Sequence, residues 1–344
     1  MLTSRMKVAI VGAGLWGENH GRLYQDHPLT EVVAVCDRDA ARAAALAGTL
    51  GVSGVYTDHR EMLAHSGCDV LAIVTPDFAH ADIAIDAANA GRSMIIEKPL
   101  ATTREDVFRI REAVERNGVR AMVDLHNRWS PAFHVAHQSL ERGELGDLVS
   151  AYFRLNDVRS VATDMLSWAA RSSILWFLGS HSLDTLRWFF GSEVKRVFAV
   201  SRSGLLRSLG VDTVDLYQST LEFGNGGIAQ MENGWITPNG NPNVNDIKCN
   251  LLGTKGMIAI DASHHTLLQK VTDTGVEVPD MLVKHRIYGE AKGFAFESIR
   301  TFIDRMADGR PFPVTLEDAA NTSLSILAIM DSAARREPVD VDYG

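Results

Sequence analysis

The sequence predicts an α/β protein with a doubly wound parallel sheet at its N-terminus, followed by an α+β domain with a large, open, mainly antiparallel sheet. A chain of 344 residues exceeds the usual size of one compact core. Residues 7–126 alternate apolar strand-like segments with helical ones, whereas paired strands dominate after residue 127. We therefore expect two domains, at 1–126 and 127–344.

The first domain contains six candidate strands that are rich in Val, Ile and Ala and show little alternation. That pattern is typical of a parallel sheet covered on both faces. The expected strands are 7–12, 31–37, 54–58, 70–76, 93–99 and 120–126. Thr102 followed by Glu105 resembles a helix capping box, and Gly91 and Gly118 stand where helices should end. The result is a series of alternating strands and helices.

The second domain begins with a strand near 149–158 and an amphipathic helix near 174–190, which Gly191 should end. Two hairpins follow, one turning at Asn225-Gly226-Gly227 and one at Gly253-Thr254-Lys255-Gly256. The segment 316–336 predicts a closing helix. A broad sheet of this kind, with helices on one face, leaves its other face for a partner subunit.

The segment Gly12-Ala13-Gly14-Leu15-Trp16-Gly17 follows the first strand directly and has the spacing G-x-G-x-x-G. In a dinucleotide-binding unit the first glycine permits the tight turn, the second lets the backbone approach a pyrophosphate, and the third lets helix and strand pack closely. The N–H groups at the start of the following helix would then face the phosphates. The context predicts a dinucleotide-binding Rossmann domain.

The second strand ends at Asp37, about 20 residues after the third glycine, where an acidic residue binds the adenosine ribose of NAD. Its negative charge would repel the 2′-phosphate of NADP. Arg38 is adjacent and would instead attract that phosphate. We expect NAD, with NADP as the alternative. Asp39 is the better candidate for capping the next helix.

Two further segments predict catalytic chemistry. Glu97-Lys98-Pro99 stands at the carboxyl end of a parallel strand, where doubly wound sheets bind ligands. Lys98 would hydrogen-bond both a cofactor ribose and a substrate hydroxyl. His181 stands near the start of the helix ended by Gly191, where it would exchange a proton with a substrate. Asp184, one turn later, would hold His181 or pair with Arg187.

Composition excludes several classes of function. A net charge of −9 and the lack of any Lys/Arg run argue against a nucleic-acid partner. No apolar run approaches the length of a membrane span. Three widely spaced cysteines form neither a disulfide framework nor a zinc pattern, and they suit the cytoplasm. His134 and His137 lack a third ligand at recognisable spacing, so no metal site is predicted.

The ordered motifs together resemble one family over essentially the whole chain. They are the glycine fingerprint, Thr75-Pro76 with His80, Glu97-Lys98-Pro99, Asn127-Arg128 with Pro131, and G-x-H-x-x-D at 179–184. This combination is similar to the Gfo/Idh/MocA family, the glucose–fructose oxidoreductase and inositol dehydrogenase group. The resemblance implies an oxidoreductase that uses NAD(P) on a sugar, polyol or related secondary alcohol, assembled as a homodimer or homotetramer through the second-domain sheet.

The resemblance also assigns roles to residues of this chain. Lys98 and His181 would be the proton-handling pair. The cofactor would be held by Gly12, Gly14, Leu15, Trp16, Gly17, Asp37, Arg38, Thr75, Pro76, His80, Glu97, Lys98 and Asn127. The substrate would be lined by Lys98, Arg128, Asp157, Trp168, Trp176, Phe177 and His181.

One position departs from the family pattern. Dehydrogenases of the family commonly carry an Asp four residues before the catalytic His, and this chain has Phe177 there. Either Asp157 or Asp164 supplies the missing carboxylate, or Lys98 and His181 act alone. Two other functions stay open: an NAD-retaining enzyme that cleaves or eliminates glycosides, and a non-enzymatic NAD-sensing regulator. The presence of both Lys98 and His181 argues against the regulator.

Overall fold

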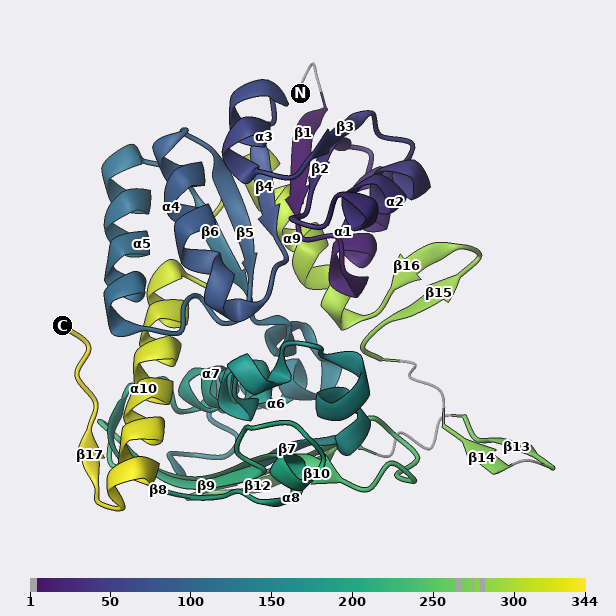
Figure 1. The fold of residues 1–344 in the computed structure, drawn as a ribbon. Helices are drawn as coiled ribbons and strands as arrows, with labels where there is room; N and C mark the ends of the chain where they lie inside the picture. The colour runs from purple at the N-terminus through teal and green to yellow at the C-terminus, as the bar shows by residue number, and fades with distance from the viewer. Residues whose placement is uncertain (1–4, 264–267, 274, 279–281) are drawn as a thin grey trace. The chain divides into compact units, whose positions relative to one another are not determined.

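The computed structural model describes residues 5–263, 268–273, 275–278 and 282–344 (Figure 1). The chain forms two compact units. One contains residues 1–126 and 283–320, and the other contains residues 127–282 and 321–344. The return of 283–320 to the first unit was not expected, because the sequence assigned everything after residue 126 to the second domain.

A parallel six-stranded sheet forms the centre of the first unit, in the order β3-β2-β1-β4-β5-β6. The strand order reverses between β1 and β4, which is the place where doubly wound sheets bind ligands. The strands are β1 Met6–Val11, β2 Thr30–Cys36, β3 Gly54–Tyr56, β4 Val70–Ile73, β5 Ser93–Glu97 and β6 Ala121–Asp124. The expected strands are confirmed, with ends displaced by up to three residues.

The helices of the first unit pack against this sheet in two groups. Helix α1 contacts α2 and α9, and α4 contacts α5. The helices are α1 Leu15–Asp26, α2 Ala40–Leu50, α3 His59–His65, α4 His80–Asn89, α5 Arg104–Asn117 and α9 Phe294–Asp308, with a 3₁₀ turn η1 Asp77–Ala79 and a hairpin of β15 His285–Ile287 and β16 Glu290–Lys292.

Side-chain caps explain where two of these helices begin. Asp39 accepts hydrogen bonds from the N–H groups of Ala41 and Arg42, so the expected cap of α2 is confirmed. The expected box at Thr102 and Glu105 is wrong by one residue, because Thr103 accepts from the N–H of Asp106 instead. Gly118 ends α5 in the left-handed conformation, as expected.

A mixed seven-stranded sheet organises the second unit, in the order β12-β11-β7-β10-β9-β8-β17. Its pairs are antiparallel except β10 with β7. The strands are β7 Leu148–Val158, β8 Val194–Arg202, β9 Leu216–Phe223, β10 Ile228–Thr237, β11 Asn245–Gly253, β12 Met257–Asp261 and β17 Val339–Asp340, and a separate hairpin pairs β13 Lys270–Thr272 with β14 Gly275–Glu277. Both expected hairpins are confirmed by the β9–β10 and β11–β12 pairs.

Helices cover one face of this sheet. Apolar side chains of α7 and α10 form one core with the inward-facing side chains of β7 and β10. The helices and helical turns are η2 His126–Trp129, α6 Pro131–Glu141, η3 Val161–Met165, η4 Ala169–Arg171, η5 Leu175–Gly179, α7 Ser180–Phe190, α8 Leu205–Ser208 and α10 Leu316–Arg335. Helix α10 begins in the first unit and continues into the second.

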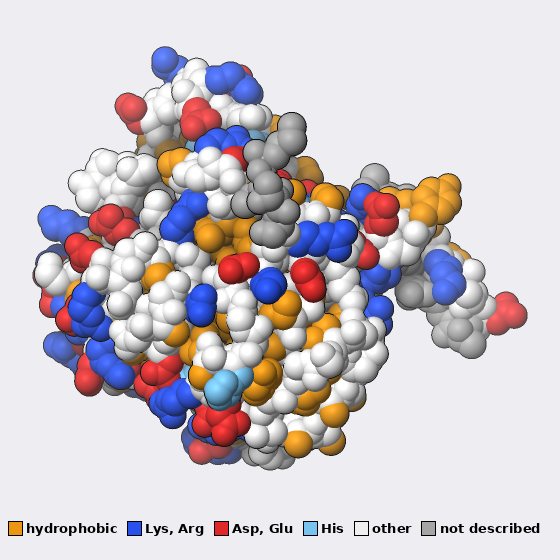
Figure 2. Space-filling model, turned by 90° about the horizontal axis from the view of Figure 1, so that it is seen from above, with side chains coloured by type: hydrophobic (Ala, Val, Ile, Leu, Met, Phe, Trp, Pro, Cys, Tyr) orange, Lys and Arg blue, Asp and Glu red, His pale blue; other side chains and the backbone are white. Residues whose placement is uncertain are grey.

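The opposite face of the second-unit sheet carries exposed apolar side chains. Register places Phe198 of β8, Ile228 of β10 and Met257 of β12 on this face. Val200 and Leu252 are exposed beside them. Figure 2 shows Lys and Arg side chains interspersed with Asp and Glu over the face in view. Across the described residues, no helix combines the length and apolarity that a membrane span requires.

Candidate functional site

The glycine loop between β1 and α1 is shaped by two glycines that no other residue can replace without strain. Gly12 has φ +110°, and a Cβ there would lie 2.3 Å from the carbonyl oxygen of Val74. A Cβ on Gly17 would lie 2.0 Å from the carbonyl oxygen of Gly12. Because neither residue has a Cβ, the loop can lie directly against the end of β4, and α1 can lie directly against the loop.

Gly14 differs from these two because a Cβ there would meet nothing within 4 Å. It precedes α1 as its N-cap and makes no side-chain capping bond, so the amino end of the helix is left for an external acceptor. A recess of about 310 Å³ opens beside Gly14 between α1 and α2, and Arg42 and Thr49 of α2 line its far wall. The open approach at Gly14 fits the pyrophosphate of a dinucleotide.

Asp37 holds the glycine loop directly. Its Oδ2 accepts a hydrogen bond from the N–H of Ala13 at 2.8 Å, and its Oδ1 accepts from the N–H of Asp39 at 2.9 Å. The side chain is half-buried, whereas the neighbouring Arg38 is exposed. Asp37 therefore ties the end of β2 to the loop after β1, which places a carboxylate beside the recess where a ribose would bind.

The ends of β4 and β5 supply the other cofactor candidates. Thr75 follows β4, and its Oγ1 is buried without a hydrogen-bond partner among the described residues. Lys98 follows β5 and is half-buried. Because an unsatisfied buried hydroxyl costs free energy, the Thr75 hydroxyl suits a ligand group at this edge of the sheet. Together with Gly14, it makes the first unit a fit for a dinucleotide.

His80 is fully buried, and both of its ring nitrogens contact backbone carbonyls. Nδ1 lies 2.7 Å from the carbonyl oxygen of Pro99, and Nε2 lies 3.0 Å from that of Thr75. The family resemblance implies a cofactor contact for His80. In the structure its ring lies between the segment after β4 and the segment after β5, with each nitrogen at hydrogen-bond distance from a carbonyl.

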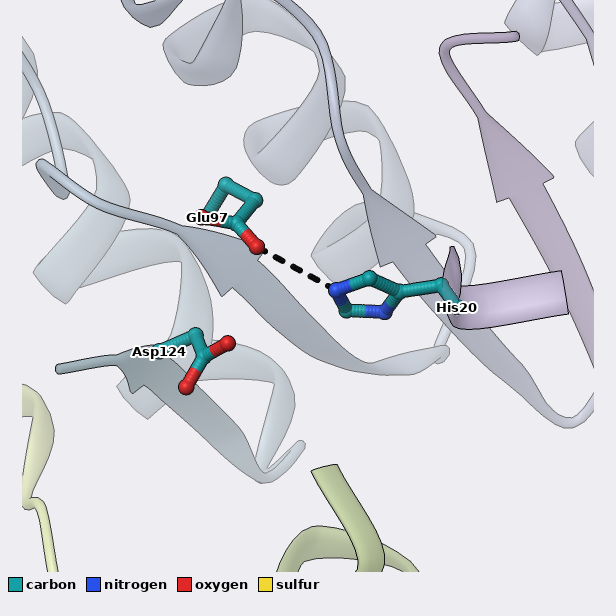
Figure 3. A group of neighbouring side chains, drawn as sticks. All are labelled: His20, Glu97 and Asp124. Carbon is teal, nitrogen blue, oxygen red and sulfur yellow. Dashed lines mark hydrogen bonds and ion pairs between the residues drawn. The ribbon is translucent and has the colours of Figure 1, made fainter. Parts of the chain in front are cut away.

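A buried cluster of His20, Glu97 and Asp124 was not anticipated from the sequence (Figure 3). Their ligand-type atoms all lie within 4.8 Å of one another. His20 Nε2 lies 3.2 Å from Glu97 Oε1, its Nδ1 lies 3.0 Å from the hydroxyl of Tyr24, and Asp124 Oδ1 accepts from the Ser298 hydroxyl at 2.6 Å. Nitrogen and carboxylate donors of this kind can bind a divalent metal. In this arrangement His20 and Glu97 bond to each other, whereas Asp124 bonds to Ser298.

The electrostatics of this cluster favour an ionised Glu97. Burial alone would raise the pKa of Glu97, but the hydrogen bond and charge of His20, with Lys98 and His126, hold that pKa below its ordinary value. Burial raises the pKa of Tyr24 well above its usual value, and the charges of Asp124 and Glu97 add to the effect. One signal for His20 was present in the sequence: it lies three residues after Gly17, on the helix face that meets the sheet.

In the second unit, His181 stands in the first turn of α7, directly after the π-helical turn η5. The His181 side chain is buried. π-Helical turns such as η5 occur often at functional sites. Asp184, one turn later, faces a different partner from the two that the sequence suggests. It binds the guanidinium of Arg128, and Arg187 pairs with Glu193 at 2.5 Å.

Phe177 occupies the position where the family carries an Asp. Its ring meets those of Trp168 and Trp235 edge-on, with centroids 6.2 and 5.7 Å apart. Trp176 is buried in the second-unit core. Of the two candidate replacements, Asp157 is 1% exposed and accepts from the amide of Asn245, whereas Asp164 is exposed. Asn127 donates to the Thr185 hydroxyl at 3.4 Å.

Of the two histidines of α6, His134 is exposed and His137 packs against an aromatic ring. His137 stacks on Trp188 with centroids 3.9 Å apart and lies 3.7 Å from Glu141. Burial lowers the pKa of His137, against the opposing charge of Glu141. The three cysteines, Cys36, Cys68 and Cys249, are buried and form no disulfide.

Comparison with known proteins gives matches over both units. Residues 6–125 match the oxidoreductase family described as having an NAD-binding Rossmann fold, and residues 133–259 match the GFO/IDH/MocA C-terminal domain. The chain is 34% identical to the D-apiose dehydrogenase of Paraburkholderia graminis over 203 residues, which are 58% of this chain and 53% of that protein. It is 25% identical to the NAD⁺-dependent scyllo-inositol 2-dehydrogenase of Bacillus subtilis, over 98% of this chain and 97% of that protein.

The fold is also similar to that of solved structures. A scyllo-inositol dehydrogenase from Lactobacillus casei, solved with bound NAD(H) and scyllo-inositol, superposes with a TM-score of 0.83. Its sequence is 19% identical, and the superposition covers 98% of this chain and 99% of that chain. At that identity the likeness establishes the shared fold.

Proposed function

Because this chain belongs to the Gfo/Idh/MocA family of NAD-binding oxidoreductases, we propose that it oxidises a sugar, an inositol or another polyol at a secondary alcohol, or reduces the corresponding ketone. It is an NAD-dependent enzyme acting on CH–OH groups. The observation that carries the proposal is the pairing of an open glycine loop at Gly14 with Lys98 at the end of β5. Relatives named for D-apiose and scyllo-inositol support this class of substrate.

NAD supplies the hydride acceptor when it is bound, and the protein orients it and manages the proton. The N-terminal turn of α1 binds the pyrophosphate, and Asp37 receives the adenosine ribose. The charge of Asp37 selects NAD over NADP, and Arg38 is too exposed to reverse that selection. Asp37→Asn keeps an oxygen acceptor for the N–H of Ala13 but removes the charge, so it should raise the NADP/NAD ratio of kcat/KM, whereas Asp39→Asn should not.

Lys98 Nζ donates a hydrogen bond to the reacting oxygen, and the imidazole of His181 accepts the proton of the alcohol. Asp157 is the better replacement for the missing carboxylate, because it is buried at the end of β7 and hydrogen-bonded, whereas Asp164 faces solvent. A general acid or base placed in this way contributes about 10²–10⁴-fold to a rate. Lys98→Ala should therefore lose about that factor in kcat while NADH binding remains measurable.

The second candidate function is a related reaction. An enzyme of this fold that retains its NAD would oxidise the sugar transiently, cleave or eliminate a substituent, and return the hydride. Phe177 favours it, because the carboxylate common in the family's dehydrogenases is missing at that position. Net accumulation of NADH separates the two, and a non-enzymatic NAD sensor would give neither reaction.

We also propose that copies of the chain assemble through the exposed face of the second-unit sheet, as a homodimer or homotetramer. The apolar side chains of Phe198, Ile228 and Met257 support this, since exposed apolar patches mark association surfaces. Buried, unpaired cysteines support a reducing, cytoplasmic location.

A further inference from the structure

We propose that His80 is a positioning residue whose imidazole carries a hydrogen on both nitrogens and fastens the loop after β4 to the loop after β5. The inference deepens the proposed function, since it concerns the two loops that carry Thr75 and Lys98. The two contacts are short: 2.7 Å from Nδ1 to the carbonyl oxygen of Pro99, and 3.0 Å from Nε2 to that of Thr75.

The number of donors decides the protonation state. A backbone carbonyl oxygen only accepts hydrogen bonds, and a neutral imidazole has one N–H and one lone pair. A neutral ring would therefore bond to one carbonyl and point a lone pair at the other. The ring is fully buried, so water cannot relieve that repulsion. The 2.7 Å contact is short, at the lower end of the N–H···O range, as a bond donated by the ring to that carbonyl would be.

The position of His80 explains what the two bonds accomplish. Strands β4 and β5 are paired up to Ile73 and Ile96, and the ladder ends there. The carbonyls of Thr75 and Pro99 lie beyond the last pair, and both contact the His80 ring. The imidazole of His80 therefore connects the two loops where the hydrogen-bond ladder between β4 and β5 has ended. It fixes the spacing between the two loops at the sheet edge where a doubly wound fold binds its ligand.

A positive charge at this position has an electrostatic cost. His80 is the first residue of α4, and the amino end of a helix disfavours a cation. The two carbonyl dipoles favour the charge, and Asp77 in η1 and Asp82 in the first turn of α4 bring negative charge to the same end of the helix. Because both nitrogens are occupied, His80 has no polar atom left for the cofactor and acts on it through Thr75 and Pro99.

The first test reads the ring nitrogens of His80 in the intact protein. Protein labelled with ¹⁵N-histidine would be studied by NMR at neutral pH, with the His80 signals assigned by their loss in His80→Gln or, if that variant folds poorly, in His80→Asn. We expect both nitrogens of His80 to give the shifts of protonated nitrogen. One protonated and one unprotonated nitrogen would overturn the proposal.

The second test measures NAD affinity by calorimetry, a readout that does not depend on the alcohol oxidised. His80→Gln can satisfy one carbonyl at most, so NAD should bind about tenfold or more weakly, which corresponds to about 1.4 kcal/mol. His59→Gln is the matched control, because the imidazole of His59 pairs with Asp86 of α4 rather than with a carbonyl of either loop. Unchanged NAD affinity in folded His80→Gln would contradict a positioning role. A failure of Lys98→Ala to lose turnover would instead contradict the proposed function alone.

Discussion

Arg128 and Asp184 form a buried, two-pronged ion pair in the second unit. Arg128 Nε lies 2.9 Å from Asp184 Oδ2, and Arg128 Nη2 lies 2.6 Å from Asp184 Oδ1. Arg128 belongs to η2 and Asp184 to α7, one turn after His181. The pair therefore fixes the helix that carries the proposed acid–base histidine, and it gives Arg128 a structural role.

Replacing one partner of this ion pair should strongly destabilise the second unit. Asp184→Asn would leave a buried guanidinium without its counter-charge, and losses of this kind cost about 3–5 kcal/mol. The free energy of unfolding in urea measures the effect. Asp212→Asn is the control, because Asp212 pairs with Arg207 at the surface, where such a pair contributes little. Equal losses in both variants would contradict the structural role.

Substitutions at the glycines should separate folding from cofactor binding. Gly14→Ala adds a Cβ into open space at φ −85°, so the protein should fold normally and bind NAD more weakly. Gly48→Ala is the matched control, since its Cβ also meets nothing but lies within α2. It should stabilise the protein by about 0.5–1 kcal/mol without changing NAD affinity. Thermal unfolding and calorimetry measure both quantities, and normal NAD affinity in Gly14→Ala would exclude the loop as the binding site.

The lowered pKa of Glu97 predicts a loss of stability in acid. In the unfolded chain Glu97 takes up a proton as the pH falls below the ordinary pKa of 4.5. In the folded state this carboxylate stays ionised to lower pH. The stabilisation is complete above that ordinary value and disappears as the pH falls through the folded pKa. Glu97→Gln should therefore show a shallower acid dependence of the unfolding free energy than wild type.

Glu115→Gln is the control for this experiment, because Glu115 is exposed on α5. Urea denaturation at a series of pH values below 4.5 provides the measurement. Parallel curves for wild type and Glu97→Gln would contradict the assigned role of the His20 contact.

The proposed assembly through the second-unit sheet predicts a change in mass. Phe198→Asp places a charge in the exposed apolar face, so it should dissociate the oligomer when its molar mass is measured by light scattering. Val135→Asp is the control, because Val135 is equally apolar and 58% exposed but lies on α6. A monomeric wild type would contradict the assembly, as would an oligomer that tolerates Phe198→Asp.

The elements of the first sheet could be predicted from sequence because buried parallel strands leave uninterrupted apolar runs. Short glycine turns likewise marked both second-unit hairpins. Neighbouring Thr102 and Thr103 both have an acid three residues later, so spacing alone could not identify the true cap. The parallel pairing of β10 with β7 was missed because it joins strands that are distant in the chain.

Contacts between distant segments were the part that sequence could not supply. An amphipathic pattern gives α9 an apolar face but does not state which sheet that face meets. Arg128 and Asp184 are 56 residues apart, and nearer partners for Asp184 were available along its own helix. Asp124 ends a buried strand and gave no periodic signal, so its approach to His20 became visible only in the folded chain.

Net hydride transfer between NAD and a secondary alcohol is the reaction proposed for this enzyme. The direct measurement is the nicotinamide absorbance of the wild-type enzyme with NAD⁺ and a panel of sugars, inositols and other polyols, followed in reverse with NADH and keto-sugars. We expect at least one substrate to yield NADH and ketone in equal amounts. No net change in absorbance across the panel, with a glycoside in it cleaved at constant NAD⁺, would show that the enzyme does not carry out net hydride transfer.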